Sequence, residues 1–130
     1  PEGVWAAAVF YANEGFQLNF LSAGHTRHAR NIDASTRVAA TIQEDYADWT
    51  AIKGIQLEGT AQLLAGPERA AAVAHYAEKF QFLKQPVAAI EKALGGVKWY
   101  RLTPERMYFV DNSRGFGNRD EIDLSTLLYS

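Results

Sequence analysis

An alternating pattern of apolar and polar residues between Gly54 and Leu63 constrains the fold of this chain more than any other feature. One set of alternate positions is apolar or small and the other is mostly polar: Ile55, Leu57, Gly59, Ala61 and Leu63 alternate with Gly54, Gln56, Glu58, Thr60 and Gln62. A period of two residues is typical of a β-strand with one buried face. Gly59 in the middle of this strand predicts a bulge or a sharp bend, as a closing barrel requires.

Further strand-like segments lie on both sides of this alternation. Near the N-terminus, the apolar run Trp5–Tyr11 and the alternating run Phe16–Leu21 flank a short turn and predict a β-hairpin. The segment Arg37–Gln43, with its β-branched residues, predicts another strand. Two more strands are expected at Val97–Leu102 and Arg106–Val110. The chain is therefore expected to be rich in strands at both ends.

Between these two strand-rich parts the pattern becomes helical. The segment Gly66-Pro67-Glu68 places a proline and an acid in the first turn of a helix. Apolar residues then recur at helical spacing and predict one buried stripe, formed by Ala70, Val73, Ala74, Ala77 and Phe80. A second short helix is expected from Pro86 to Gly95. This order favours an antiparallel sheet or barrel with a helix pair at one side, and it disfavours a doubly wound nucleotide fold.

Composition limits the function classes. A chain of 130 residues with 48% hydrophobic and 22% charged residues is expected to form one globular domain, residues 1–130. Its net charge of −2 argues against a nucleic-acid partner. The absence of cysteine excludes disulfides, thiol nucleophiles and thiolate metal sites. No apolar run reaches the ~20 residues that cross a membrane, and the first residues lack a signal-peptide pattern, so we expect no membrane partner and a cytoplasmic location.

A dense set of anion-binding groups follows the second expected strand. The donors are hydroxyl, guanidinium and imidazole groups: Ser22, Thr26, Arg27, His28 and Arg30. Thr26 is expected to cap a helix over residues 27–32, which would turn free backbone N–H groups and the positive end of the helix dipole towards the same anion. The alternative is a solvated turn followed by a surface helix whose charges serve only solubility.

Other arrangements of reactive residues give weaker signals. The spacing of His25, His28 and Asp33 matches no strong zinc pattern, so no metal site is predicted. No nucleophile with a neighbouring base is recognisable, and no catalytic acid or base is assigned. The segment Gly115-Phe116-Gly117 lacks the third glycine of a phosphate fingerprint and is interpreted as a tight loop. Most aromatic residues are expected in the core, and one or two are expected to stack on a ring system.

Several motifs, taken in order, resemble the FMN-binding split β-barrel family related to pyridoxamine 5′-phosphate oxidase. They are Val9–Tyr11, Phe20–Ser22, Thr26–Ile32, Arg37–Ala39 and Ile52–Gly59. A final motif, Val110–Gly117, resembles an uncharacterised bacterial branch of that family. The likeness covers nearly the whole chain. It implies a mainly β fold, an antiparallel six-stranded split β-barrel with a helix pair, assembled as a homodimer.

The resemblance also implies that FMN lies at the subunit interface of this homodimer. The phosphate-binding turn of the family corresponds to Thr26, Arg27 and His28. In the family, the strand before this turn lies along the flavin, the backbone of an earlier strand faces the isoalloxazine, and a later loop approaches the ribityl chain or the ring. The residues at these places are Phe20, Leu21, Ser22, Val9, Phe10, Lys53 and Gln56.

The chain departs from the family pattern in places that bear on its activity. It has Gly115-Phe116-Gly117-Asn118-Arg119 where the oxidase carries an Arg-x-His motif that holds the pyridoxal substrate, so pyridoxamine phosphate oxidation is not expected. His28 stands where the family often has lysine, which predicts a weaker and pH-dependent phosphate partner. From the resemblance we expect the N-terminal helix and first strand of the family to be missing or shortened. We therefore expect either a trimmed chain or a barrel that closes differently.

Three hypotheses about function follow. The leading one is an FMN-binding flavoprotein that acts as an oxidoreductase on an unidentified small substrate, with the flavin supplying the redox chemistry. The second is a non-catalytic module that holds FMN, haem or a deazaflavin as a carrier or sensor, with His25 and His28 as haem candidates. The third is a dimeric, stress-related protein with an empty site.

Overall fold

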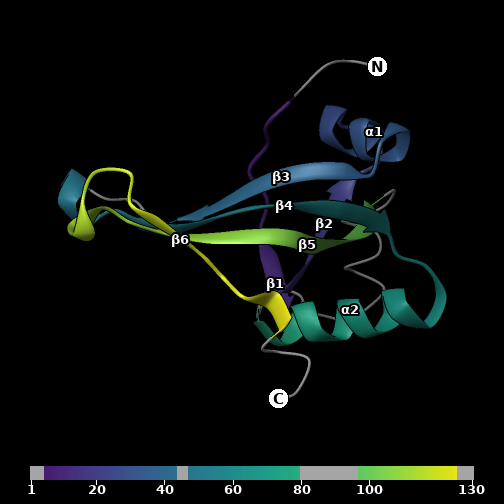
Figure 1. Ribbon diagram of the computed structural model, residues 1–130. Helices are drawn as coiled ribbons and strands as arrows, with labels where there is room; N and C mark the ends of the chain where they lie inside the picture. The colour runs from purple at the N-terminus through teal and green to yellow at the C-terminus, as the bar shows by residue number, and fades with distance from the viewer. Residues whose placement is uncertain (1–4, 44–46, 80–96, 126–130) are drawn as a thin grey trace. The chain divides into compact units, whose positions relative to one another are not determined.

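A computed structural model describes residues 5–43, 47–79 and 97–125 of the chain. Over these residues six strands and two α-helices follow one another (Figure 1): β1 Tyr11–Glu14, β2 Gln17–Ala23, α1 Arg27–Ala34, β3 Arg37–Gln43, β4 Lys53–Leu63, α2 Gly66–Lys79, β5 Val97–Asp111 and β6 Arg119–Glu121. The strand order in the sheet is β1-β2-β5-β4-β3, and β6 pairs with β5. The predicted mainly β fold with six antiparallel strands is confirmed. The expected helix from Pro86 to Gly95 lies outside the described residues.

Long-range contacts divide the chain into two compact units, which are described separately below. The first comprises Pro1–Thr36 and Ala61–Leu102, and the second comprises Arg37–Thr60 and Thr103–Ser130. That residues 1–130 act as a single domain stays a prediction. Among the described residues, no helix is both long and apolar enough to span a membrane.

The first unit begins with a hairpin whose position differs from the prediction. The expected strand over Trp5–Tyr11 is wrong, because regular strand structure begins only at Tyr11 and continues to Glu14. Glu14 pairs with Gln17, so the turn consists of two residues and starts at Gly15, whose φ is 58°. A two-residue hairpin turn needs a positive φ at its centre, and glycine adopts it at little cost. The position of this glycine therefore sets where β1 ends.

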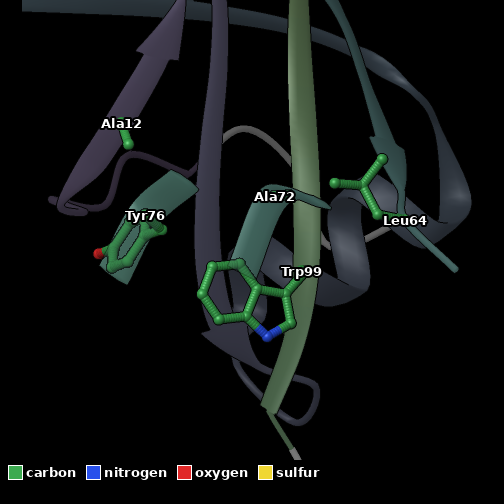
Figure 2. Close-up of a cluster of buried hydrophobic side chains, with 5 residues drawn as sticks. All are labelled: Ala12, Leu64, Ala72, Tyr76 and Trp99. Carbon is green, nitrogen blue, oxygen red and sulfur yellow. The ribbon is translucent and has the colours of Figure 1, made fainter. Parts of the chain in front are cut away.

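The core of the first unit forms where α2 packs against β1 and β2 (Figure 1). Figure 2 shows the five side chains of this cluster, which are Ala12, Leu64, Ala72, Tyr76 and Trp99. The rings of Tyr76 and Trp99 meet edge to face, with centroids 5.1 Å apart. The Tyr76 hydroxyl donates to the backbone oxygen of Phe10 at 3.1 Å, so its polar end is also satisfied.

The apolar stripe predicted for α2 is displaced from its expected position. Ala72 and Tyr76 are the buried residues of this helix, with Val73 and Ala77 packed beside them. Ala70 and Ala74, which were expected to be buried, are exposed, and Phe80 lies outside the described residues. The side of the helix that carries the tyrosine ring faces the core, because this large ring buries more apolar area than an alanine methyl group does.

In the second unit, β3 pairs with β4 in a regular antiparallel register. The predicted strand Arg37–Gln43 is confirmed at both ends, and Val38, Ala40 and Ile42 form its less exposed face as expected. Gly59 is paired with Val38 without interruption, so the bulge predicted at Gly59 is not found against β3. A Cβ atom at Gly59 would collide with the backbone oxygen of Thr103, and this close approach explains the glycine.

Two further strand predictions need correction. The segments Val97–Leu102 and Arg106–Val110 belong to one continuous strand, β5, and Pro104 lies within it. The alternation of β4 holds up to Ala61, but Leu63 is 51% exposed while Leu64, just past the end of the strand, is buried. The backbone N–H of Leu64 donates to the oxygen of Trp99 at 2.8 Å. Leu64 rather than Leu63 therefore contributes to the core.

The glycine-rich segment of the second unit forms the predicted tight loop. Two short 3₁₀ turns, η1 Trp49–Ala51 and η3 Asn112–Arg114, are tied together by the buried Asn112. Its backbone N–H donates to Ile52 at 2.9 Å and its side-chain amide donates to the Trp49 oxygen at 3.0 Å. Its side-chain oxygen accepts from the N–H of Gly117 at 3.1 Å. This loop presents the exposed Phe116 ring against the edge of Trp49.

Candidate functional site

The candidate site lies in the first unit, where β2 ends and α1 begins. A tight turn closed by the Thr26 N–H, which donates to the Ala23 oxygen at 3.1 Å, separates the two elements. This turn brings three side chains together. The Ser22 hydroxyl is hydrogen bonded to Nε2 of His28, and Thr26 Oγ1 lies 3.4 Å from Ser22 Oγ and 3.5 Å from the same imidazole nitrogen. We refer to Ser22, Thr26 and His28 as the hydroxyl–imidazole cluster.

Thr26 occupies the N-cap position of α1 as predicted, but the predicted side-chain cap is wrong. The Thr26 hydroxyl donates to the backbone oxygen of Ala23 at 2.8 Å instead of accepting from an N–H of the helix. The first turn of α1 also contains no acidic residue. The first N–H groups of a helix have no partner within it, and they favour an anion. This helix start is therefore suited to an anion from outside the chain.

The imidazole of His28 is partly buried, and this burial lowers its pKa. A histidine with a lowered pKa is mostly neutral at neutral pH. A neutral imidazole has one N–H donor and one acceptor nitrogen, so His28 is able to hydrogen bond without adding a fixed charge. The cluster therefore offers a ligand mainly neutral hydrogen-bonding groups.

Arg27 supplies a permanent positive charge at the first position of α1. Its guanidinium carbon lies 4.5 Å from the centre of the Trp5 ring, which is a favourable cation–π arrangement. Arg30, which the sequence also placed among the anion-binding residues, donates to the backbone oxygen of His25 and so holds the turn. Of the two arginines, Arg27 is at the first position of the helix and Arg30 stabilises the loop before it.

The other candidates on β2 divide between the two faces of the sheet. Phe20 lies on the same face as Ser22, and its ring is stacked on that of Tyr100 with centroids 5.5 Å apart. Leu21 lies on the opposite face and packs against the core cluster beside Trp99. Phe20 therefore belongs with the hydroxyl–imidazole cluster, whereas the Leu21 side chain has a packing role and only its backbone is available to a ligand.

The remaining candidates lie elsewhere. Val9 and Phe10 precede β1 and are 40% and 73% exposed. Lys53 and Gln56 belong to β4 in the second unit, where both are exposed. Gln56 accepts a hydrogen bond from Arg119 at 3.1 Å. The pKa of Asp111 is lowered mainly by the hydrogen bond from the Ser113 side chain and, to a smaller extent, by the charge of Lys53.

The sequence did not reveal two polar residues on the site face of β5. Lys98 is the register partner of Ser22, and Tyr100 is the register partner of Phe20. The Tyr100 hydroxyl is fully buried, and within the described part of the chain it has no hydrogen-bond partner. Burial and, to a smaller extent, the charge of Asp33 raise the pKa of Tyr100. Only the pairing of β2 with β5, which are distant in sequence, brings these residues to the site.

The acidic and histidine side chains of the described residues were considered as metal ligands by their positions in the fold. In residues 5–43, 47–79 and 97–125, no group of three or more histidine, aspartate or glutamate side chains is placed to hold a metal ion. The candidate site is thus described by its anion-binding and aromatic groups.

Known proteins resemble this chain in both sequence and structure. The sequence profile of the pyridoxamine 5′-phosphate oxidase family matches residues 1–111. A UPF0306 protein from Klebsiella pneumoniae is 30% identical over 118 residues, which are 89% of this chain and 74% of the relative.

Solved structures with a similar fold include two proteins described by their relation to haem. A haem-binding protein from Mycobacterium smegmatis superposes with a TM-score of 0.70 at 24% identity, over 93% of this chain and 48% of that one. The chain thus spans about half the length of that protein. The haem storage protein HutZ from Vibrio cholerae gives a TM-score of 0.60 at 20% identity, over 76% of this chain and 71% of that one. These similarities show a shared fold.

Proposed function

The chain belongs to the pyridoxamine 5′-phosphate oxidase family, and from this premise we propose that it binds FMN through the hydroxyl–imidazole cluster and Arg27. The observation that carries the proposal is the start of α1, where Ser22, Thr26 and His28 converge beside a helix turn that has neither a side-chain cap nor an acid. A phosphate monoester needs several hydrogen-bond donors and a positive potential. At this turn the Ser22 hydroxyl, the His28 imidazole and the first N–H groups of α1 supply donors, and the helix start and Arg27 supply the potential. The Thr26 hydroxyl donates to Ala23 and shapes the turn.

The residues around the cluster fit the rest of the cofactor. In this proposal Phe20 and the backbone of Leu21 support one side of the flavin, and the exposed segment with Val9 and Phe10 faces the ring. Exposed large apolar side chains are a feature of surfaces that ligands or partners cover. We propose that a homodimer covers them and holds FMN at its interface, with Lys53 and Gln56 near the ribityl chain or the ring.

Bound FMN would supply redox chemistry, and the protein would supply binding, orientation and electrostatics. The proposed activity is that of an oxidoreductase acting on a small molecule in the cytoplasm. Pyridoxamine phosphate oxidation is not proposed, because residues 115–119, a tight loop that leads into β6 and leaves Phe116 85% exposed, stand in place of an Arg-x-His motif. Oxidation of NADH or NADPH by the FMN-loaded protein would distinguish an enzyme from a carrier.

Haem binding is the second candidate function. It is supported by the haem-related descriptions of two proteins with the same fold and by His25, which is exposed in the turn next to the cluster. An exposed imidazole is available as an axial ligand of haem iron. In this alternative the protein is a non-catalytic carrier or sensor, a role in which a deazaflavin is also a possible cargo.

The FMN proposal is tested by replacing Ser22 with alanine. Ser22→Ala removes a buried donor from the cluster, and we expect FMN binding to weaken by about 1.5–3 kcal/mol if the hydroxyl bonds to a charged phosphate. Titration of flavin fluorescence measures the change. Ser35→Ala is the matched control, because Ser35 is exposed at the other end of α1. Equal affinities of Ser22→Ala and Ser35→Ala would exclude this turn as the phosphate site.

A further inference from the structure

Lys98 is a cation whose position brings it to the proposed phosphate site. It is paired directly with Ser22 in the antiparallel register of β2 and β5. Side chains of directly opposed residues in such a pair lie on the same face of the sheet. The lysine therefore projects on the face that carries the Ser22 hydroxyl, although it comes from a distant part of the sequence.

Gly24 leaves the space that the Lys98 side chain occupies. A Cβ atom at Gly24 would lie 2.9 Å from Cε, 3.2 Å from Cδ and 3.5 Å from Nζ of this lysine. The end of the Lys98 side chain, from Cδ to Nζ, thus lies beside Gly24, within the turn between Ser22 and Thr26. This arrangement explains a glycine at a position where no positive φ is required.

Asp33 is the acid that faces the ammonium. Its Oδ2 lies 3.5 Å from Lys98 Nζ, and the two side chains are 41% and 42% exposed. Ion pairs with this exposure are screened by water and contribute little to stability. The pair therefore keeps Lys98 beside the turn at low cost, and the ammonium stays able to interact with a more highly charged anion.

The same face holds an unsatisfied polar group beneath this ion pair. Tyr100 follows Lys98 by two residues on β5, its side chain is fully buried, and its hydroxyl has no hydrogen-bond partner among the described residues. The charge of Asp33 acts on this hydroxyl. A buried, unpartnered hydroxyl is costly and is often explained by a ligand or ordered water that completes the site.

From these positions we infer that Lys98 is a further binding residue of the phosphate site and makes it selective for phosphorylated flavin over riboflavin. The inference rests on the proposed function, because it concerns the same turn. A phosphate monoester carries between one and two negative charges at neutral pH, whereas the ribityl end of riboflavin is uncharged. The charge of Lys98 therefore strengthens the binding of FMN but not that of riboflavin.

The test measures FMN and riboflavin binding to the full chain and to three variants by flavin fluorescence. Lys98→Met removes the charge and keeps most of the stem, and we expect FMN affinity to fall about tenfold with riboflavin affinity unchanged. Lys98→Arg keeps the charge and should bind FMN within about twofold of the unmodified chain. Arg69→Met is the control for net charge, because Arg69 is exposed on α2, which packs on the Trp99 side of the sheet.

Each outcome has a distinct meaning. If the unmodified chain binds no FMN, the proposed function itself fails. If FMN binds and Lys98→Met leaves its affinity unchanged, or weakens FMN and riboflavin equally, the role of Lys98 in phosphate selection is overturned. An equal loss of FMN affinity in Arg69→Met would also overturn it, because the effect would then come from net charge.

Discussion

At the scale of single residues, the candidate site combines neutral donors with few permanent charges. Ser22 is buried at the end of β2, Thr26 uses its hydroxyl to close the turn, and His28 has a pKa lowered by burial. Neutral donors avoid the desolvation cost that a buried charge would carry. The positive potential comes instead from the helix start, from Arg27 at its first position and, in our proposal, from Lys98 on β5.

The lowered pKa of His28 predicts how stability changes with pH. The unfolded chain binds a proton at this histidine at a higher pH than the folded chain does, so the folded state loses stability as the pH falls below about 6.5. We expect the free energy of unfolding to decrease between pH 7.5 and pH 5 more strongly in the unmodified protein than in His28→Gln. Urea unfolding of the ligand-free proteins at both pH values measures this difference. If the free energy of unfolding fell equally with pH in both proteins, the stability change would not come from His28.

At the scale of secondary-structure elements, close backbone contacts fix the positions of the strands. Gly59 of β4 lies against the backbone of Thr103 and Pro104 on β5, and both contacts are within the second unit. Only a residue without Cβ permits this approach. Pro104 is tolerated within β5 at this contact. The sequence had predicted a break between two strands at this position.

Gly59→Ala is therefore expected to destabilise the protein by more than about 2 kcal/mol, because the added methyl group meets a backbone oxygen that a side-chain rotation does not move. The midpoint of urea unfolding reports this loss. Thr60→Ala is the control at the next position, whose side chain lies on the other face of β4 and is partly exposed. Similar midpoints for both variants would show that the backbone contact is looser than described.

The elements that the sequence predicted well are those with a strong local signal. Both β3 and β4 follow a period of two and match their predicted ranges closely, and the site turn was found because Ser22, Thr26 and His28 lie within one short segment. The start of β1 was missed because an apolar run does not reveal whether it is paired. Lys98 and Tyr100 were missed because strand pairing between distant segments, and no local pattern, brings them to the site.

At the scale of the whole molecule, neither the family membership nor the fold identifies the cofactor. The cofactor is inferred from the residues of the site. Proteins of this fold include ones described as haem-binding, and the chain spans about half the length of one of them. The donors at the start of α1 suit a phosphate better than a carboxylate-bearing macrocycle, because they converge on one compact point. This convergence is why FMN is the leading proposal.

The proposed homodimer predicts a specific mass in solution. Exposed Trp5, Val9 and Phe10 in the first unit would be covered by the second copy and the cofactor, so we expect the FMN-loaded protein to sediment at about twice the chain mass of 14.4 kDa. Sedimentation velocity of the protein with and without FMN measures this. A monomer that retains FMN would contradict the placement of the cofactor at a subunit interface.

The most direct test of the central claim is the absorbance spectrum of the purified protein after incubation with FMN, and in a parallel sample with haem, followed by removal of unbound ligand. We expect flavin bands at close to one FMN per chain, and weaker flavin bands in Ser22→Ala than in Ser35→Ala. A protein that retains no flavin after incubation with FMN, while the parallel sample shows a Soret band after incubation with haem or neither ligand is retained, would contradict the proposal that this turn is an FMN phosphate site.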